Sequence, residues 1–243
     1  MSHRRVRHLP FSLGSGTTGA KLVLYAPAMR GYANYDLVET WADLSGKGND
    51  AAASVIASRP TYRTAIQGGM PGLNFLSRNG VVGNWNYTLT SETVIQVLQA
   101  ASQGTFARYF TQSDASLDYA TSNPYIPLLK NGVGNNNITG YDVTGFRSII
   151  AYNSAWSIAT ATHSGSFIVN FLNGIAGSSA SGTLSKLFTR FGIGTTPLAD
   201  NLAPTEAING YIGGLVAYDA AISASLRQRI QQSNGFTFRI ATK

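Results

Sequence analysis

Near its C-terminus the chain reads Asn209-Gly-Tyr-Ile-Gly-Gly-Leu-Val-Ala-Tyr-Asp-Ala-Ala-Ile-Ser223, and the fold can be worked out from this stretch. Its first part alternates with a period of two, which is the period of a β-strand, and both sides are apolar. We therefore expect a central strand, with a β-bulge or a close backbone approach at Gly213-Gly214. Unbroken alternation gives two sets of side chains: Tyr211, Gly213, Leu215 and Ala217 on one side, and Ile212, Gly214, Val216 and Tyr218 on the other.

After Asp219 the spacing of apolar residues changes from that of a strand to that of a helix. Ser223 is of a residue type that caps helices, and Leu226 and Ile230 are four residues apart. This spacing predicts a short helix, with Arg227 on its polar side. The alternation of residues 236–240 predicts one more short strand.

The rest of the chain has the composition of many strands joined by tight turns. It has 243 residues, 26 of them glycine, and only 12% are charged. Asn173-Gly174 predicts a type I′ hairpin turn, and the polar, glycine-rich residues 130–142 predict an exposed loop or hairpin. About a dozen strands suit a two-sheet antiparallel sandwich of one domain. The main strand candidates are residues 21–26, 73–75, 81–89, 92–100, 105–112, 146–152, 156–163, 166–172 and 187–194.

Several motifs occur in the order found in one fold family. They are Trp41-Ala-Asp-Leu-Ser-Gly-Lys-Gly-Asn-Asp-Ala51, Arg59-Pro-Thr-Tyr62, Gly69-Met-Pro-Gly-Leu-Asn-Phe75, Phe171-Leu-Asn-Gly-Ile175, Phe191-Gly-Ile-Gly194 and Tyr218-Asp-Ala-Ala-Ile-Ser223. With these motifs, the chain between about residues 20 and 240 resembles the concanavalin A-like lectin/glucanase superfamily, in particular its laminin-G-like jelly rolls. The resemblance implies an all-β, two-sheet antiparallel jelly-roll sandwich with one short helix near the C-terminus. It does not fix a function, because this architecture serves lectins, glycosidases, adhesins and viral coat components.

Positive charge is concentrated at the two ends of the chain. The net charge is +7, and residues with no acid near them in sequence account for all of it: Arg4, Arg5, Arg7, Arg227, Arg229, Arg239 and Lys243. The neutral body argues against a nucleic-acid partner. We expect residues 1–19 to form a basic arm and glycine-rich hinge before a sandwich domain of residues 20–243, with Arg4, Arg5 and Arg7 docking to a partner.

The glycine motif Gly14-Ser-Gly-Thr-Thr-Gly19 has the G-x-G-x-x-G form of a dinucleotide site. A basic arm precedes it and a predicted strand follows, whereas such a site needs a strand before it and a helix after it. We therefore interpret the motif as a hinge, and we expect no cofactor.

Catalytic groups are sparse. There is no cysteine, and the three glutamates, Glu39, Glu92 and Glu206, lack the close pairing that a retaining glycosidase requires. Asp114 and Asp118 lie in a predicted turn region, and a carboxylate pair assembled by the fold is the alternative. The three histidines, two of them on the arm, predict no metal site, and His163 is expected at the surface or in a turn and not as a general base. We predict a protein without enzymatic activity.

The turn at residues 41–50 contains several side-chain oxygens, including those of Asp43, Asn49 and Asp50. Such side chains commonly bond the backbone of their own turn. A calcium ion is the alternative, although Ca²⁺ takes about six to eight oxygen ligands, more than these side chains supply.

Sugar recognition uses aromatic faces together with amide groups. Residues of the right chemistry are Trp85, Tyr87, Asn135, Asn136, Asn137 and Tyr141. A role in the core or in turns is the alternative for each of them.

The leading hypothesis from sequence is a structural or interaction protein of a larger assembly, most simply a bacteriophage virion component docked by its arm. We expect several copies in contact with other virion proteins, assembly in the host cytoplasm, and no signal peptide, because His8 and Pro10 interrupt the early apolar run. No apolar segment approaches the roughly 20 residues of a membrane span. The alternative is a lectin-like module that binds a glycan, for example on a host surface.

Overall fold

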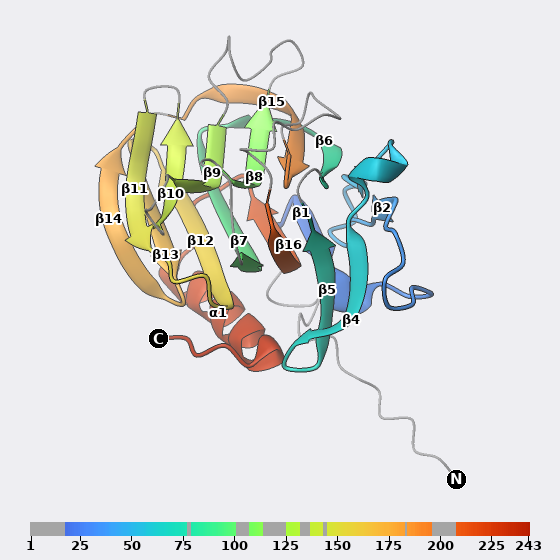
Figure 1. Cartoon of the computed structure of the whole chain (residues 1–243). Coiled ribbons are helices and arrows are strands. Elements are labelled where there is room, and N and C mark those ends of the chain that lie inside the picture. Colours follow the sequence, from blue (N-terminus) through green and yellow to red (C-terminus); the bar gives the residue numbers. More distant parts are fainter. Residues whose placement is uncertain are drawn as a thin grey trace.

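The computed structural model describes residues 18–76, 79–100, 107–113, 125–131, 137–142, 145–182, 184–195 and 208–243. These residues form two facing antiparallel sheets of eight strands each, with helix α1 (Ala224–Phe238) packed on the outer side of the first sheet (Figure 1). The predicted all-β, two-sheet jelly-roll sandwich is confirmed.

The first sheet has the spatial order β14, β13, β12, β7, β16, β5, β4, and β1 also pairs with β16. The second sheet has the order β11, β10, β9, β8, β15, β6, β3, β2. The strand bounds are β1 Leu22–Tyr25, β2 Thr40–Trp41, β3 Ala51–Ala52, β4 Thr61–Gln67, β5 Met70–Phe75, β6 Val81–Leu89, β7 Ser91–Ala100, β8 Arg108–Ser113, β9 Tyr125–Asn131, β10 Asn137–Asp142, β11 Gly145–Ala151, β12 Ser157–Ser164, β13 Phe167–Leu172, β14 Ile175–Ser181, β15 Lys186–Ile193 and β16 Gly210–Tyr218; the short 3-10 helices are η1 Ala26–Ala28 and η2 Ile56–Ser58.

Most of the predicted strands are present, and the predicted hairpin turn is confirmed. Asn173 and Gly174 have φ angles of 51° and 89°, as a type I′ turn requires. Residues 130–142 are part of the hairpin of β9 and β10, whose connecting residues 132–136 lie outside the described ranges.

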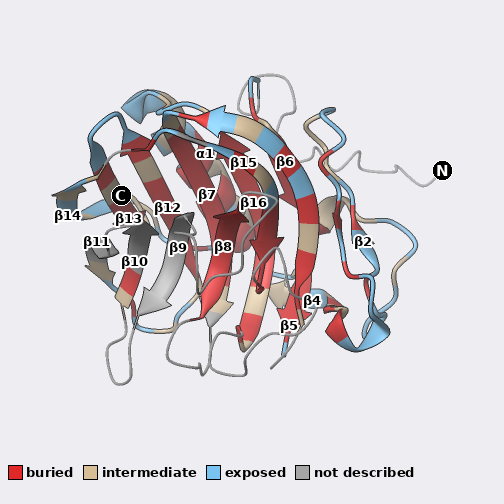
Figure 2. Ribbon diagram, turned by 90° about the horizontal axis from the view of Figure 1, so that it is seen from above, coloured by how far each residue is buried: buried red, intermediate tan, exposed pale blue. Residues whose placement is uncertain are grey.

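Strand β16 is central, as its sequence predicts. It pairs with β7 along one edge and with β5 and then β1 along the other. Leu215 and Ala217 lie in the core between the two sheets, and Val216 and Tyr218 lie in the second core between the first sheet and α1. Figure 2 shows how densely buried positions cover this strand and its neighbour β7.

The predicted bulge is also present, and it changes which way the first residues of β16 face. The register with β7 shifts between Ile212 and Gly214. As a result Ile212 joins Leu215 between the sheets, and Tyr211 stacks on Trp156 with ring centroids 6.0 Å apart. The expectation of unbroken alternation is wrong at this point, because a bulge inserts one extra residue and reverses the alternation before it.

Helix α1 begins as predicted and ends later than predicted. The Ser223 hydroxyl caps it by accepting the Leu226 N–H at 3.2 Å. The helix continues to Phe238, so the strand predicted for residues 236–240 is wrong. One face of the helix has residues at intervals of four: Leu226, Ile230, Asn234 and Phe238. This helical spacing extends into residues 236–240, which also alternate as a strand would.

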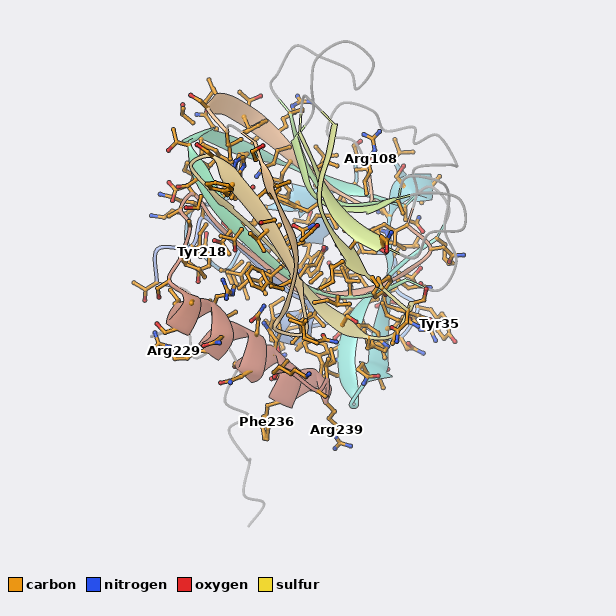
Figure 3. The ribbon with its side chains drawn as sticks, turned by 90° about the vertical axis from the view of Figure 1, so that its left-hand side faces the viewer. Tyr35, Arg108, Tyr218, Arg229, Phe236 and Arg239 are labelled. Carbon is orange, nitrogen blue, oxygen red and sulfur yellow. The ribbon has the colours of Figure 1, made fainter. Side chains whose placement is uncertain are left out.

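Arg227 is not on the solvent side of the helix, contrary to the sequence-based expectation. Its guanidinium lies 3.8 Å from the ring centroid of Phe171, and burial lowers its pKa. Arg229, by contrast, is exposed and points away from the sheets (Figure 3).

Among the described residues, no helix has both the length and the apolar character needed to cross a bilayer.

Because β16 is buried on both faces, we expect a charged side chain introduced there to destabilise the fold strongly. Val216→Asp places a carboxylate in the apolar layer under α1, at a cost of several kcal/mol, comparable with the roughly 5–15 kcal/mol stability of a whole domain. We expect this variant to be insoluble or unfolded in thermal melts. The control Arg229→Asp changes an exposed position and should shift stability by about half a kcal/mol at most. Equal melting temperatures for the two variants would contradict the placement of β16.

The bulge predicts a specific contact between β16 and the end of α1. A Cβ at Gly213 would lie 2.6 Å from the Phe238 ring. Gly213→Ala should therefore cost about 1–3 kcal/mol through overpacking. In a double-mutant cycle measured by denaturant unfolding, the same substitution should cost less in a Phe238→Leu background. An unchanged cost in that background would rule out this contact as the reason for the glycine.

Candidate functional site

The structure does not bring the predicted sugar-binding residues together. Trp85 and Tyr87 lie in β6, whereas Asn137 and Tyr141 lie in β10. Three strands, β9, β8 and β15, separate β10 from β6, which corresponds to roughly 19 Å at the usual strand spacing. Asn135 and Asn136 lie outside the described residues, as do Arg4, Arg5 and Arg7 of the arm.

Trp85 is a core residue. It is 1% exposed, and its ring packs edge to face on Tyr87, Phe110 and Phe191. A ring enclosed in this way presents no face to a sugar. Tyr87 is half-buried, and its hydroxyl accepts a hydrogen bond from the Asn49 amide at 3.4 Å.

The turn at residues 41–50 uses its own oxygens. The Asp43 carboxylate accepts hydrogen bonds from the backbone N–H groups of Val23, Ser45 and Asn49 at 2.9 to 3.0 Å, and from the Ser45 hydroxyl at 2.7 Å. Asp50 accepts the Asp43 N–H at 2.7 Å. These contacts favour the turn interpretation over a calcium ion. In the described part of the chain, no three His, Cys, Asp or Glu side chains are grouped as metal ligands.

Glu39 and Glu92 do not form a catalytic pair. Glu39 is at the edge of the second sheet and forms an ion pair with Arg59 at 2.9 Å. Glu92 is in β7, in the middle of the first sheet; it is 1% exposed and accepts a hydrogen bond from the Gln112 amide. Glu206, Asp114 and Asp118 lie outside the described ranges.

His163 is opposite Glu92 on the neighbouring strand and is buried, which corrects the expectation that it lies at the surface. Its Nε2 is 2.9 Å from the carbonyl oxygen of Gly182. The residue is part of a polar layer inside the sandwich.

An open groove of about 1260 Å³ lies between the β4–β5 hairpin and the C-terminal end of α1. We call it the hairpin–helix groove. The two elements meet at the lower side of the molecule in Figure 1. Its lining residues come from η1 and the segment after it, from the hairpin, and from the last turn of α1 and the tail: Pro27, Arg30, Tyr62, Thr64, Gly68, Gly69, Met70, Pro71, Ser233, Gly235, Phe236, Thr237, Arg239, Ile240 and Ala241.

Glycine backbone geometry forms the hairpin side of this groove. Gly68 and Gly69 have φ angles of 60° and 77°, and Gln67 pairs with Met70, which is the geometry of a tight hairpin turn. A Cβ at Gly68 would lie 3.2 Å from the carbonyl oxygen of Phe238 and 3.0 Å from Cγ of Arg239. The hairpin can therefore approach the helix end closely.

A left-handed residue forms the helix side. Arg239 has a φ of 53° and ends α1, and the Gly235 carbonyl accepts hydrogen bonds from the N–H groups of Arg239 and Ile240. The chain turns sharply here, and Phe236 and Arg239 both project outward (Figure 3). The Phe236 ring is 90% exposed, the largest value among the exposed apolar residues of the described chain.

The groove combines aromatic surface with cationic groups. Tyr62 is buried beside Tyr32, with ring centroids 5.6 Å apart. Burial raises the pKa of the Tyr62 hydroxyl, and the positive charge of Arg30 acts in the opposite direction. The Arg30 guanidinium donates to the carbonyl oxygens of Pro27 and Met29 at 3.0 and 3.4 Å. No Asp or Glu is among the described residues that line the groove.

The sequence does not indicate this groove, because its parts are far apart in the chain. Gly68-Gly69 is a usable signal for a hairpin turn. The alternation of residues 236–240 favours a strand for Phe236, and the position of Arg239 in the chain indicates only that it belongs to the basic C-terminus.

No family model matches the chain, and no curated protein matches it. The fold is similar to that of a Trypanosoma rangeli sialidase in complex with sialic acid, at 13% identity and a TM-score of 0.62 over 93% of this chain and 34% of that one. The binding domain of botulinum neurotoxin serotype D is 13% identical, with a TM-score of 0.62 over 90% of this chain and 52% of that one. The chain thus spans about a third of the sialidase and half of the toxin domain.

Domain 4 of AbnA, an extracellular arabinanase of Geobacillus stearothermophilus solved in complex with arabinotriose, is matched over its full length. It is 12% identical, with a TM-score of 0.59, and the match covers 82% of this chain and 100% of that one. Similarity at these identities shows the fold, a lectin-like β-sandwich. Because only part of each sialidase chain is matched, the comparison does not assign this chain a glycosidase activity.

The separation of Glu39, at the edge of the second sheet, from Glu92, in the first sheet, predicts no hydrolysis by this pair. The isolated protein should release no reducing ends from a panel of neutral and acidic polysaccharides, because the two-carboxylate mechanism needs acids held about 5 Å apart. Turnover that is lost in Glu39→Gln or Glu92→Gln, and retained in a control such as Arg229→Gln, would contradict this prediction.

Proposed function

We propose that this chain is a glycan-binding β-sandwich module and that an oligosaccharide binds in the hairpin–helix groove. The observation that carries the proposal is the open groove with the almost fully exposed ring of Phe236 among its lining residues. An exposed aromatic ring is costly to leave in water and useful when it covers the apolar face of a sugar.

The size and polar groups of the groove suit an oligomer. Its volume of about 1260 Å³ is larger than the roughly 300–1000 Å³ of a small-molecule pocket. The guanidinium groups of Arg30 and Arg239 and the hydroxyls of Thr64 and Ser233 can bond sugar hydroxyls. The similarity to a domain solved with arabinotriose supports the same class of ligand.

The predicted role in a phage virion stays a prediction. The residues proposed to dock, Arg4, Arg5 and Arg7, lie outside the described ranges, as does most of the proposed arm of residues 1–19. Location in a virion, contacts with other virion proteins and the presence of several copies are likewise untested. A glycan-binding module is compatible with such an assembly, in which it would contact a host surface.

The proposal predicts that Phe236 contributes to binding. Phe236→Ala should weaken oligosaccharide binding by about 2- to 10-fold, which corresponds to about 0.5–1.5 kcal/mol for one aromatic contact. Ligands would first be found on a glycan array with the full chain, and affinities would then be measured by calorimetry.

Phe167→Ala is the matched control, because Phe167 is 58% exposed but lies in β13, outside the groove. The Phe167→Ala variant should bind the oligosaccharide with the same affinity as the parent chain. Loss of binding in Phe167→Ala with retention in Phe236→Ala would move the binding site elsewhere.

A further inference from the structure

We propose that the hairpin–helix groove selects anionic oligosaccharides, that is, sugars that carry carboxylate or sulfate groups. This inference rests on the proposed function and adds the chemical class of the ligand to it.

The charged side chains among the described residues that line the groove are all positive. Arg30 lies near Tyr62, and Arg239 lies against the hairpin turn at Gly68. Both arginines are exposed, and within the described ranges neither forms an ion pair; the ion pairs there are Lys21 with Asp219 and Arg59 with Glu39. Within the part of the chain that the structure describes, two guanidinium groups without acidic partners thus line the groove and can bind a ligand.

Arginine is well suited to carboxylate and sulfate groups. Its planar guanidinium donates two parallel hydrogen bonds to such anions, and these charge-assisted bonds are stronger than neutral ones. The contacts of Arg30 with two backbone carbonyls hold its side chain in place and reduce the entropy lost on binding.

The C-terminal end of α1 is the feature that works against an anion, because helix C-termini carry partial negative charge. Here two carbonyls near the helix end already accept hydrogen bonds from groups other than a ligand. The Gly235 carbonyl accepts the Ile240 N–H at 2.8 Å, and the Ser233 carbonyl accepts the Thr237 hydroxyl at 2.9 Å. Arg239, at the helix end itself, supplies a compensating positive charge.

The chain's own basic arm is not a good occupant of this groove. Arg4, Arg5 and Arg7 have the same sign of charge as Arg30 and Arg239. An external ligand with negative charge fits better, and the exposed ring of Phe236 favours a sugar over a simple anion.

The test compares the full chain with four probes: oligogalacturonate, a heparin-derived oligosaccharide, a neutral maltooligosaccharide and poly-glutamate. Oligogalacturonate offers carboxylates alone, and heparin adds sulfates. We expect at least one of these two sugars to bind about tenfold more tightly than the neutral sugar, with an affinity that falls as salt rises.

The variants are Arg30→Gln and Arg239→Gln, with Arg229→Gln as the matched control, since Arg229 is an exposed arginine of α1 outside the groove. Each groove variant should lose about tenfold in affinity for the anionic sugar and little for the neutral one. The control should bind as the parent does. All three positions are exposed, so thermal melts should confirm unchanged stability.

Four outcomes would overturn the inference. Equal binding of neutral and anionic sugars, unaffected by the arginine variants but weakened by Phe236→Ala, would remove the charge preference and leave the glycan function intact. Binding of poly-glutamate as tight as that of oligogalacturonate, with the same dependence on Arg30 and Arg239, would assign the groove to an acidic peptide. Absence of binding both to every array glycan and to all four probes would remove both proposals, whereas an array ligand that is neutral, with no binding of the two anionic sugars, would remove the charge preference alone.

Discussion

Strand β16 is buried on both faces, and the rest of the structure provides the two layers that cover it. The second sheet covers Leu215 and Ala217 on one face, and α1 covers Val216 and Tyr218 on the other face. A sheet with an apolar outer face cannot remain uncovered in water. This is why the described residues, whose regular elements are mostly strands, include a 15-residue helix docked on the outside of the sandwich.

The position of the helix end depends on glycines in two other elements. Gly213, in the bulge of β16, leaves room for the Phe238 ring, and Gly68, in the β4–β5 turn, leaves room for the Phe238 backbone. The ring also packs on Tyr25 and Trp156, with centroids 6.2 and 6.4 Å away. Phe238 thereby fixes the end of α1 against the hairpin. The groove and its exposed residues are consequences of that packing.

The same architecture explains why fold and function have to be argued separately. The similar solved structures include a sialidase, a toxin binding domain and a domain of an arabinanase. They share the sandwich with this chain at 12 to 13% identity, which shows a common fold and does not identify a particular ligand. The proposed function therefore depends on groups found in this chain: the Phe236 ring, and Arg30 and Arg239, which form no ion pair with the described residues.

The sequence by itself determined the elements whose signals are local. The alternation of residues 215–218, the Asn173-Gly174 turn and the Ser223 cap each depend on neighbouring residues, and all three are confirmed. Tertiary structure decided the rest. The bulge reversed the faces of the sheet on which the side chains of Tyr211 and Ile212 lie. The burial of Phe238 kept residues 236–238 in the helix, although their sequence alternates as in a strand. Sheet order separated Trp85 from Asn137 of β10, and packing joined Arg30, Phe236 and Arg239 into one groove. Such contacts link residues up to about two hundred positions apart, and no short-range pattern in the sequence encodes them.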